Sequence, residues 1–436
     1  MDLLIKDVTA VTMDEPQVVE HCHIGIENGR IVWLSPEAPQ QPARRVIQGR
    51  GKVAMPGLIN THTHMPMTLL RGYADDYTLQ EWLTQHIFPA EDRLDARCIK
   101  AGMLLGLAEA IRFGTTSISE MYFQLPTMAE ACLEAGIKAN LCNAATCFDQ
   151  AHYDFDKAGE TREMREVLER FHGADGGRIR LDAGIHAEYT SFDQVWRSNA
   201  AFAKEHGLNM QVHVSETRKE HEECLGRWGA TPVQILAENG VFDTRAIAAH
   251  CVWVTPEDME ILAEKQVTVA HNPVSNLKLA SGIAPVAEMR RRRVRVALGT
   301  DGVASNNSHD LFEEIKLCAL LQKGVSGDPC QMPAPDALAC ATVQGAFAQG
   351  REEECGRLRT GMDADLILLD FDKPWLQPVH SVISSLCYTA RGQDVCLTMV
   401  KGKILYENGA FHTIDVEKAR REVEGYALPR ILGAHA

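Results

Sequence analysis

The sequence predicts an α/β fold, namely a (β/α)₈ TIM barrel with a small β-sandwich domain formed by the N- and C-terminal segments. Eight apolar, strand-like runs alternate with amphipathic stretches over residues 55–362, as expected for parallel strands joined by helices. Strand-like segments with Asn-Gly turns occupy both ends of the chain, and such turns are typical of hairpins. A doubly wound open sheet is the alternative, but no GxGxxG motif follows any of the runs.

The terminal segments predict a composite domain. Residues 1–54 consist of short strand-like runs, and residues 363–412 show a similar pattern. Each of the two segments contains an "ENG" turn. The two segments are expected to pair into one small β domain. Residues 55–362 then form the barrel, and residues 413–436 form a charged, helix-compatible tail.

Composition excludes several classes of partner. The chain of 436 residues carries 44 Lys and Arg against 59 Asp and Glu, a net charge of −15, which disfavours nucleic acid and anionic membranes as partners. The N-terminus lacks the pattern of a signal peptide, and no apolar run is long enough to span a bilayer. Thirteen cysteines occur without a CxxC motif, as in a reducing compartment. A cytoplasmic protein is therefore expected.

Histidine and acidic residues recur at the C-terminal ends of the predicted strands. In "MPGLINTHTHMP", His62 and His64 are two residues apart, so both imidazoles share one face of a strand. In a (β/α)₈ barrel, the chemistry is carried by these strand ends. Reading along the chain, the strand-end residues are His62, His64, Glu120, His186, His213, His250, His271 and Asp301.

Such a set can hold a catalytic zinc, which takes three or four protein ligands and one water. The candidate ligands are His62, His64, His213 and Asp301. Glu216, three residues after His213, could take a proton from that water, and His250 could hold the developing oxyanion.

Each assignment has a structural alternative. Asp301 could cap the following segment, Glu216 could begin a helix, and His250 could be a satisfied core histidine. The roles of Glu120 and His271 stay open.

Five stretches, "PGLINTHTHMPMTLLRGYADD", "HVSET", "AHCVW", "HNPVSNLKLASG" and "LGTDGVASNNSHDLFEE", together resemble the amidohydrolase superfamily, and within it the 5′-methylthioadenosine/S-adenosylhomocysteine deaminases. The resemblance covers residues 2–410 and implies one divalent metal, usually zinc, on His62, His64, His213 and Asp301. It makes Glu216 the proton-shuttling glutamate and His250 the second active-site histidine. The fourth strand ends "DAGIHAEYT", without the lysine that bridges two metals in binuclear members.

The resemblance also implies substrate contacts. His186 corresponds to the residue that contacts the purine. In "DDYTLQEWLTQHIFPAEDRL", Trp82 would pack on the 5′-substituent or base and Glu91 would bind the ribose hydroxyls. Ordinary helix packing for Trp82 and a helix-start role for Glu91 are the alternatives.

One departure concerns the 5′-substituent. Some members carry arginines on and after the third strand that bind the homocysteine carboxylate, whereas "KANLCNAATCFDQAHYDFDK" contains none. A neutral substituent such as methylthio is therefore favoured, although Arg71 or a distant basic residue could compensate.

The expected function is hydrolytic deamination of a 5′-substituted adenosine (5′-methylthioadenosine, S-adenosylhomocysteine or adenosine) to the inosine analogue and ammonia. A deaminase or chlorohydrolase of a free heteroaromatic base, such as guanine or an s-triazine, is the alternative within the enzyme class. A non-catalytic relative is disfavoured, because all four ligand positions and Glu216 are present. Family habit implies a homo-oligomer, a dimer or tetramer.

Overall fold

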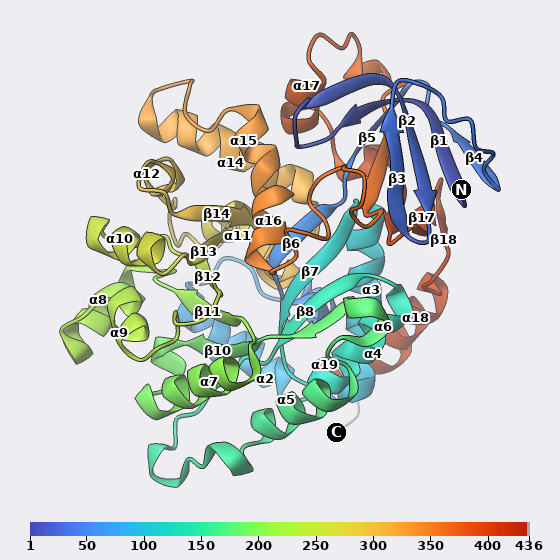
Figure 1. Ribbon diagram of the computed structural model, residues 1–436. Coiled ribbons are helices and arrows are strands. Elements are labelled where there is room, and N and C mark those ends of the chain that lie inside the picture. Colours follow the sequence, from blue (N-terminus) through green and yellow to red (C-terminus); the bar gives the residue numbers. More distant parts are fainter. Residues whose placement is uncertain (434–436) are drawn as a thin grey trace.

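The predicted barrel is present in the computed structural model, which describes residues 1–433 (Figure 1). Its strands are buried on both faces, as expected for a parallel sheet covered by helices. In order around the barrel they are β6 (Leu58–Thr63), β7 (Thr115–Met121), β8 (Lys138–Cys142), β9 (Ile179–Leu181) with β10 (Ala183–Ala187), β11 (Met210–Val214), β12 (Ala246–His250), β13 (Thr268–His271) and β14 (Arg295–Leu298).

The fourth barrel strand is interrupted, and the barrel closes between its first and last strands. Asp182, between β9 and β10, is buried and accepts hydrogen bonds from the side-chain amides of Asn140 and Gln211. Closure involves a parallel bridge between Thr63 and Asp301. One closing contact therefore includes a predicted metal ligand.

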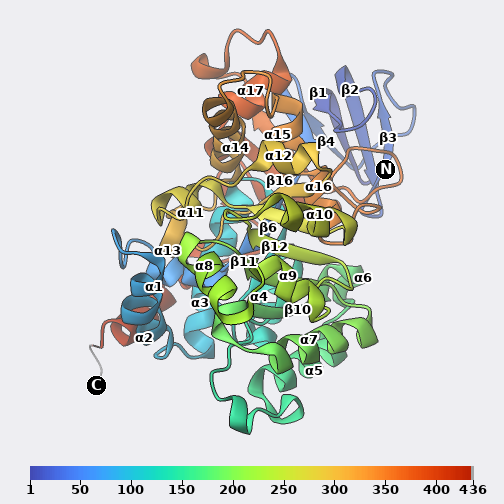
Figure 2. The same ribbon diagram turned by 90° about the vertical axis from the view of Figure 1, so that its left-hand side faces the viewer.

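Helices surround the barrel (Figures 1 and 2). Threonines cap three of them, since Thr217, Thr231 and Thr255 accept N–H groups of the first turn. The helices are α3 (Ala96–Arg112), α4 (Leu125–Ala135), α5 (Gly159–Arg170), α6 (Ala174–Gly177), α7 (Asp193–His206), α8 (Arg218–Trp228), α9 (Pro232–Glu238), α10 (Pro256–Glu264), α11 (Pro273–Lys278), α12 (Val286–Arg291), α13 (Val303–Asn306), α14 (Leu311–Ser326), α15 (Ala334–Cys340) and α16 (Val343–Ala348).

The two ends of the chain share one β domain beside the barrel (Figure 1). Its strands β1 (Leu3–Val11), β2 (Val18–Glu27), β3 (Arg30–Ser35), β4 (Arg45–Gln48) and β5 (Lys52–Pro56) come from the N-terminal segment. From the C-terminal segment come β15 (Leu366–Asp370), β16 (Val395–Val400), β17 (Lys403–Glu407) and β18 (Ala410–Phe411), and α17 (Val382–Tyr388) lies between β15 and β16. The segments join where β5 pairs antiparallel with β15, and the domain has its own apolar core. The division at residues 54/55 and 362/363 stays a prediction.

A buried ion cluster connects the β domain to the base of the barrel. Lys138, at the start of β8, is 1% exposed, and its Nζ lies 2.8 Å from an oxygen of Asp363 and 2.7 Å from one of Asp365. Burial alone would lower the pKa of Lys138, but the two carboxylates outweigh it and raise that pKa. The amine is therefore charged at neutral pH.

The C-terminal segment packs against α3. It contains α18 (Val416–Glu422), a single π-helical stretch (Val423–Ala427) and α19 (Leu428–Ile431). Tyr426 donates a hydrogen bond to Asp95, the N-cap of α3, at 2.6 Å. The last three residues of the predicted tail, 434–436, lie outside the described residues. No helix among residues 1–433 combines the length and apolarity that crossing a membrane requires.

Candidate functional site

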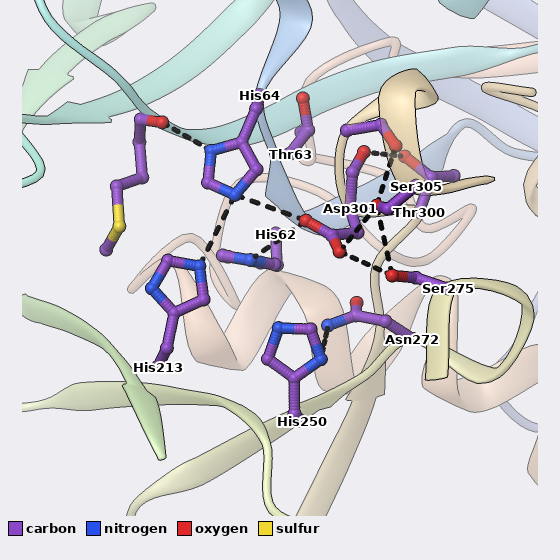
Figure 3. Close-up of polar contacts among 12 residues, drawn as sticks. His62, Thr63, His64, His213, His250, Asn272, Ser275, Thr300, Asp301 and Ser305 are labelled. Carbon is purple, nitrogen blue, oxygen red and sulfur yellow. Dashed lines mark hydrogen bonds and ion pairs between the residues drawn. The ribbon is translucent and has the colours of Figure 1, made fainter. Parts of the chain in front are cut away.

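Six of the predicted site residues meet at the carboxyl edge of the barrel, and all of them except Glu216 are labelled in Figure 3. His62 is on β6 and His64 directly follows it. His213 lies on β11, His250 ends β12, and Asp301 follows β14. Glu216 lies just beyond β11, with a carboxylate oxygen 3.7 Å from His250 Nε2. The parallel strands of the barrel thus bring together residues that are up to 239 positions apart in the sequence, from His62 to Asp301.

The nitrogens and oxygens of this group point at a common region. His64 Nε2 lies 3.1 Å from Asp301 Oδ1 and 3.3 Å from His213 Nε2. His62 Nε2 lies 3.5 Å from the same Asp301 oxygen. Two sets with metal-binding geometry result, namely His62 with His64 and Asp301, and His62 with His213 and His250.

Backbone carbonyls fix the inward orientation of two imidazoles. His64 Nδ1 donates to the Met121 carbonyl at 2.5 Å, and His213 Nδ1 donates to the His186 carbonyl at 2.6 Å. Each Nδ1 therefore carries a proton, and the Nε2 atoms of His64 and His213 face each other. His62 Nε2 is buried without a hydrogen-bond partner, and burial lowers the pKa of His62 to about 4. Imidazole nitrogens aimed at one carboxylate fit a divalent cation.

Asp301 is oriented by two serines that the sequence analysis did not single out. Its Oδ2 accepts the hydroxyl of Ser275, in α11, at 2.6 Å and that of Ser305, in α13, at 2.9 Å. Oδ1 is left facing the histidines. Asp301 also has φ = 61°, and His250 has φ = 71°. Non-glycine residues rarely adopt such backbone, and they tend to do so at functional sites.

Ser275→Ala is expected to weaken metal affinity by about 10- to 100-fold, because partners of this kind orient metal-binding carboxylates. Titration of the metal-free protein with zinc measures the effect. Ser384→Ala, an exposed change on α17, is the matched control. Equal zinc affinity in the two variants would mean that the serine does not orient Asp301.

Glu216 is a buried acid beside His250. The Ser281 hydroxyl donates to Glu216 Oε1 at 3.1 Å, while Oε2 lies near His250 Nε2. Burial raises the pKa of Glu216. On the other side of His250, Nδ1 lies 2.8 Å from Asn276 Oδ1. A carboxylate and an imidazole nitrogen thus share the edge of the metal group, which suits proton transfer.

Glu120, whose role the sequence left open, supports the first strand end. Its carboxylate accepts the Thr63 hydroxyl at 2.9 Å and the Met65 N–H at 2.9 Å. These contacts lie on either side of His64 along the chain. Glu120 therefore fixes the backbone that presents the HxH pair.

His271 does not join the group. It is buried with both ring nitrogens unpartnered, and it does not border the cavity described below.

A cavity of about 770 Å³ opens above the metal group. Trp82, Glu91 and His186 all border it, together with His64, His213, Glu216, His250 and Asp301. Trp82 and Glu91 come from one helical segment, made of α1 (Leu79–Glu81), a π-helical stretch (Trp82–Ile87) and α2 (Phe88–Glu91). The size falls within the range usual for small-molecule sites, about 300–1,000 Å³.

Glu91 is enclosed by protein but reachable through the cavity. Tyr122, which the sequence analysis missed, donates to Glu91 Oε1 at 2.5 Å. Burial raises the pKa of Glu91 to about 7 even though the Tyr122 hydrogen bond lowers it. The indole N–H of Trp82 donates to the Ala74 carbonyl at 3.1 Å, which anchors the ring while its surface borders the cavity.

Comparisons with known proteins show which family the chain belongs to. Residues 53–405 match the model of the Amidohydrolase family. A 5-methylthioadenosine/S-adenosylhomocysteine deaminase of Thermoanaerobacter pseudethanolicus is 42% identical over 97% of this chain and 98% of its own. A 5′-deoxyadenosine deaminase of Methanosarcina acetivorans is 41% identical over the full length of both chains. The crystal structure of an adenosine deaminase from Xanthomonas campestris with bound zinc superposes with a TM-score of 0.93 at 33% identity, covering 99% of each chain. The chain belongs to the amidohydrolase family.

Proposed function

We propose that the protein is a metal-dependent hydrolytic deaminase that converts a 5′-substituted adenosine to the inosine analogue and ammonia. The observation that carries this proposal is the convergence of His62, His64, His213 and Asp301 beside Glu216. All of these residues except His62 border the cavity. The names of the full-length relatives support the substrate class, with 5′-methylthioadenosine as the first candidate.

The four ligands would hold one divalent ion, and their nitrogen-rich set favours zinc. The zinc-bound adenosine deaminase supports this choice. When bound, the ion supplies Lewis-acid activation of the attacking water.

Glu216 would move the protons of the reaction. Its carboxylate takes one proton from water as the oxygen attacks C6 of the adenine, and it gives that proton to N1. Glu216 then takes the proton of the new C6 hydroxyl as the C6 carbonyl forms and the C–N bond breaks, and it passes that proton to the departing amine, which leaves as ammonia. The raised pKa of Glu216 suits both steps, since a carboxyl that is less acidic than usual takes and releases a proton more evenly.

His250 and Asp301 would steady the attacking oxygen. Asn276 holds the Nδ1 side of His250, so Nε2 is presented beside Glu216. Ser275 and Ser305 hold Oδ2 of Asp301, so Oδ1 stays directed at the histidines. Pre-orientation of this kind avoids reorganisation during the reaction.

The cavity walls would bind the nucleoside. His186 would contact the purine, Trp82 would pack on the base or 5′-group, and Glu91 would accept hydrogen bonds from the ribose diol. All three border the cavity, and Tyr122 orients the Glu91 carboxylate.

Glu91→Gln is expected to lower kcat/KM for adenosine nucleosides by about 10- to 100-fold, because hydrogen bonds to a charged acceptor are worth about 1.5–3 kcal/mol. Steady-state ammonia release measures the change, with Glu264→Gln on α10 as control. A free base has no ribose for this carboxylate. Unchanged nucleoside kinetics would therefore favour the alternative, a deaminase of guanine-like or triazine substrates.

We further propose that the protein acts in the cytoplasm as a homo-oligomer, a dimer or tetramer. Sedimentation velocity of the purified chain measures the assembly state.

An ammonia-release screen tests the proposed function. It compares 5′-methylthioadenosine, S-adenosylhomocysteine, adenosine, 5′-deoxyadenosine, guanine and a triazine under saturating zinc. Turnover of the 5′-substituted adenosines well above the free bases is expected. Turnover confined to guanine or the triazine would contradict the proposal.

A further inference from the structure

The wall of the cavity includes carboxylates and a buried amide that do not belong to the metal group. The carboxylates belong to Asp92, which follows α2, and to Glu160 and Glu163 on α5. The amide belongs to Asn143, directly after β8. These elements contribute no residue to the metal group. In the proposed binding mode, with C6 of the purine at the metal group and the ribose at Glu91, the 5′-substituent would face these residues.

Asn143 has hydrogen-bonding capacity that the protein does not use. The residue is 1% exposed and borders the cavity, and both its amide nitrogen and its amide oxygen lack a partner. An unpaired buried amide costs free energy, so such groups usually have a partner in the working state. The amide oxygen is available to a donor in the cavity.

The charged side chains of Asp92, Glu160 and Glu163 give the cavity wall a negative charge. No lysine or arginine borders the cavity among the residues that the structure describes. Glu163 Oε2 accepts the Leu125 N–H at the start of α4, at 2.9 Å, which leaves Oε1 without that constraint. Glu160 is half-buried and Asp92 is exposed at the rim. Carboxylates around a partly enclosed cavity produce a negative potential inside it.

We propose that Asn143, Glu160 and Glu163 form a charge-selective subsite, which accepts 5′-substituents that are uncharged or carry an ammonium group and disfavours those that carry a carboxylate. The inference rests on the proposed function and names the substrate class within it. The Asn143 oxygen accepts a hydrogen bond from the ammonium, and the carboxylates of Glu160 and Glu163 supply the negative potential that attracts it. A carboxylate in the same place meets repulsion and finds no cationic partner.

Two synthetic substrates of similar length test the subsite. One is 5′-aminopropylthio-5′-deoxyadenosine, which ends in an ammonium, and the other is 5′-carboxyethylthio-5′-deoxyadenosine, which ends in a carboxylate. For the zinc-loaded enzyme at low ionic strength, kcat/KM of the ammonium substrate is expected to exceed that of the carboxylate substrate by about tenfold or more. The ratio should fall as salt screens the wall.

Variants then assign the effect to residues. Glu160→Gln and Glu163→Gln should each lower the ammonium-to-carboxylate ratio by about threefold, as each removes one nearby charge. Glu169→Gln changes an exposed carboxylate on the same helix, α5, and should not alter the ratio. Asn143→Ala should lower kcat/KM of the ammonium substrate relative to 5′-methylthioadenosine by about tenfold.

The possible outcomes separate this inference from the proposed function. Rapid turnover of 5′-methylthioadenosine with a ratio near one, or with the carboxylate preferred, would overturn the subsite and leave the deaminase intact. A ratio that the two glutamine variants leave unchanged would also overturn it. Failure to deaminate any adenosine would overturn the proposed function and this inference together.

Discussion

Glu216→Gln is expected to lower kcat for adenosine deamination by about 10³- to 10⁴-fold, the usual contribution of a positioned acid–base group. Glutamine has the shape of glutamate and keeps an oxygen for the Ser281 hydroxyl, but it cannot carry a proton from water to the substrate. Single-turnover ammonia release measures the chemical step. Metal content should stay at the wild-type level, because Glu216 lies outside both sets with metal-binding geometry.

Glu222→Gln, an exposed change on α8, is the control for the loss of one acidic charge. A near wild-type kcat in Glu216→Gln would mean that a residue other than Glu216 transfers the proton. A loss of metal along with activity would instead make Glu216 a ligand rather than a proton carrier.

Lys138→Met is expected to lower the free energy of unfolding by about 3–5 kcal/mol, because removing one partner of a buried ion pair leaves an uncompensated charge. The carboxylates of Asp363 and Asp365 would stay buried without the amine that neutralises them. The damage would fall where the β domain meets the base of the barrel, far from the carboxyl edge. Urea unfolding measures the change.

Lys204→Met removes an exposed lysine from α7 and should change stability little. If the two variants unfold at the same urea concentration, the ion cluster of Lys138 does not stabilise the junction between the β domain and the barrel.

The barrel and the location of the site could be predicted because both depend on short patterns. Each barrel strand is a short apolar run, and β6, β11 and β12 each carry a histidine at or next to their C-terminal end. The predicted fold class is confirmed. Parallel strands place their carboxyl ends on one edge whatever the loop lengths, so strand order alone brings distant residues together.

Side-chain contacts between segments that are distant in the sequence could not be predicted in this way. Ser275 and Ser305 reach Asp301 from two different helices, and nothing in their spacing indicates it. Tyr122, which follows β7, meets Glu91 on α2 although the two residues are 31 positions apart in the sequence. The left-handed backbone conformation of His250 and Asp301 could not be predicted either, because non-glycine residues rarely adopt it.

Element boundaries were missed where tertiary packing overrides local preference. The run "RIRLDAGIH" predicts one strand, but Asp182 turns inward to the amides of Asn140 and Gln211 and divides it into β9 and β10. The π-helical stretch over Trp82–Ile87 has no local sequence signature either.

Elemental analysis of the wild type, His213→Ala and His271→Ala tests the central claim most directly. His271 is a buried strand-end histidine outside the metal group, so it is the matched control, with folding checked by circular dichroism. We expect about one divalent ion per chain in the wild type and in His271→Ala, and a small fraction of that in His213→Ala. A folded His213→Ala protein that retains a full equivalent of metal would contradict the claim.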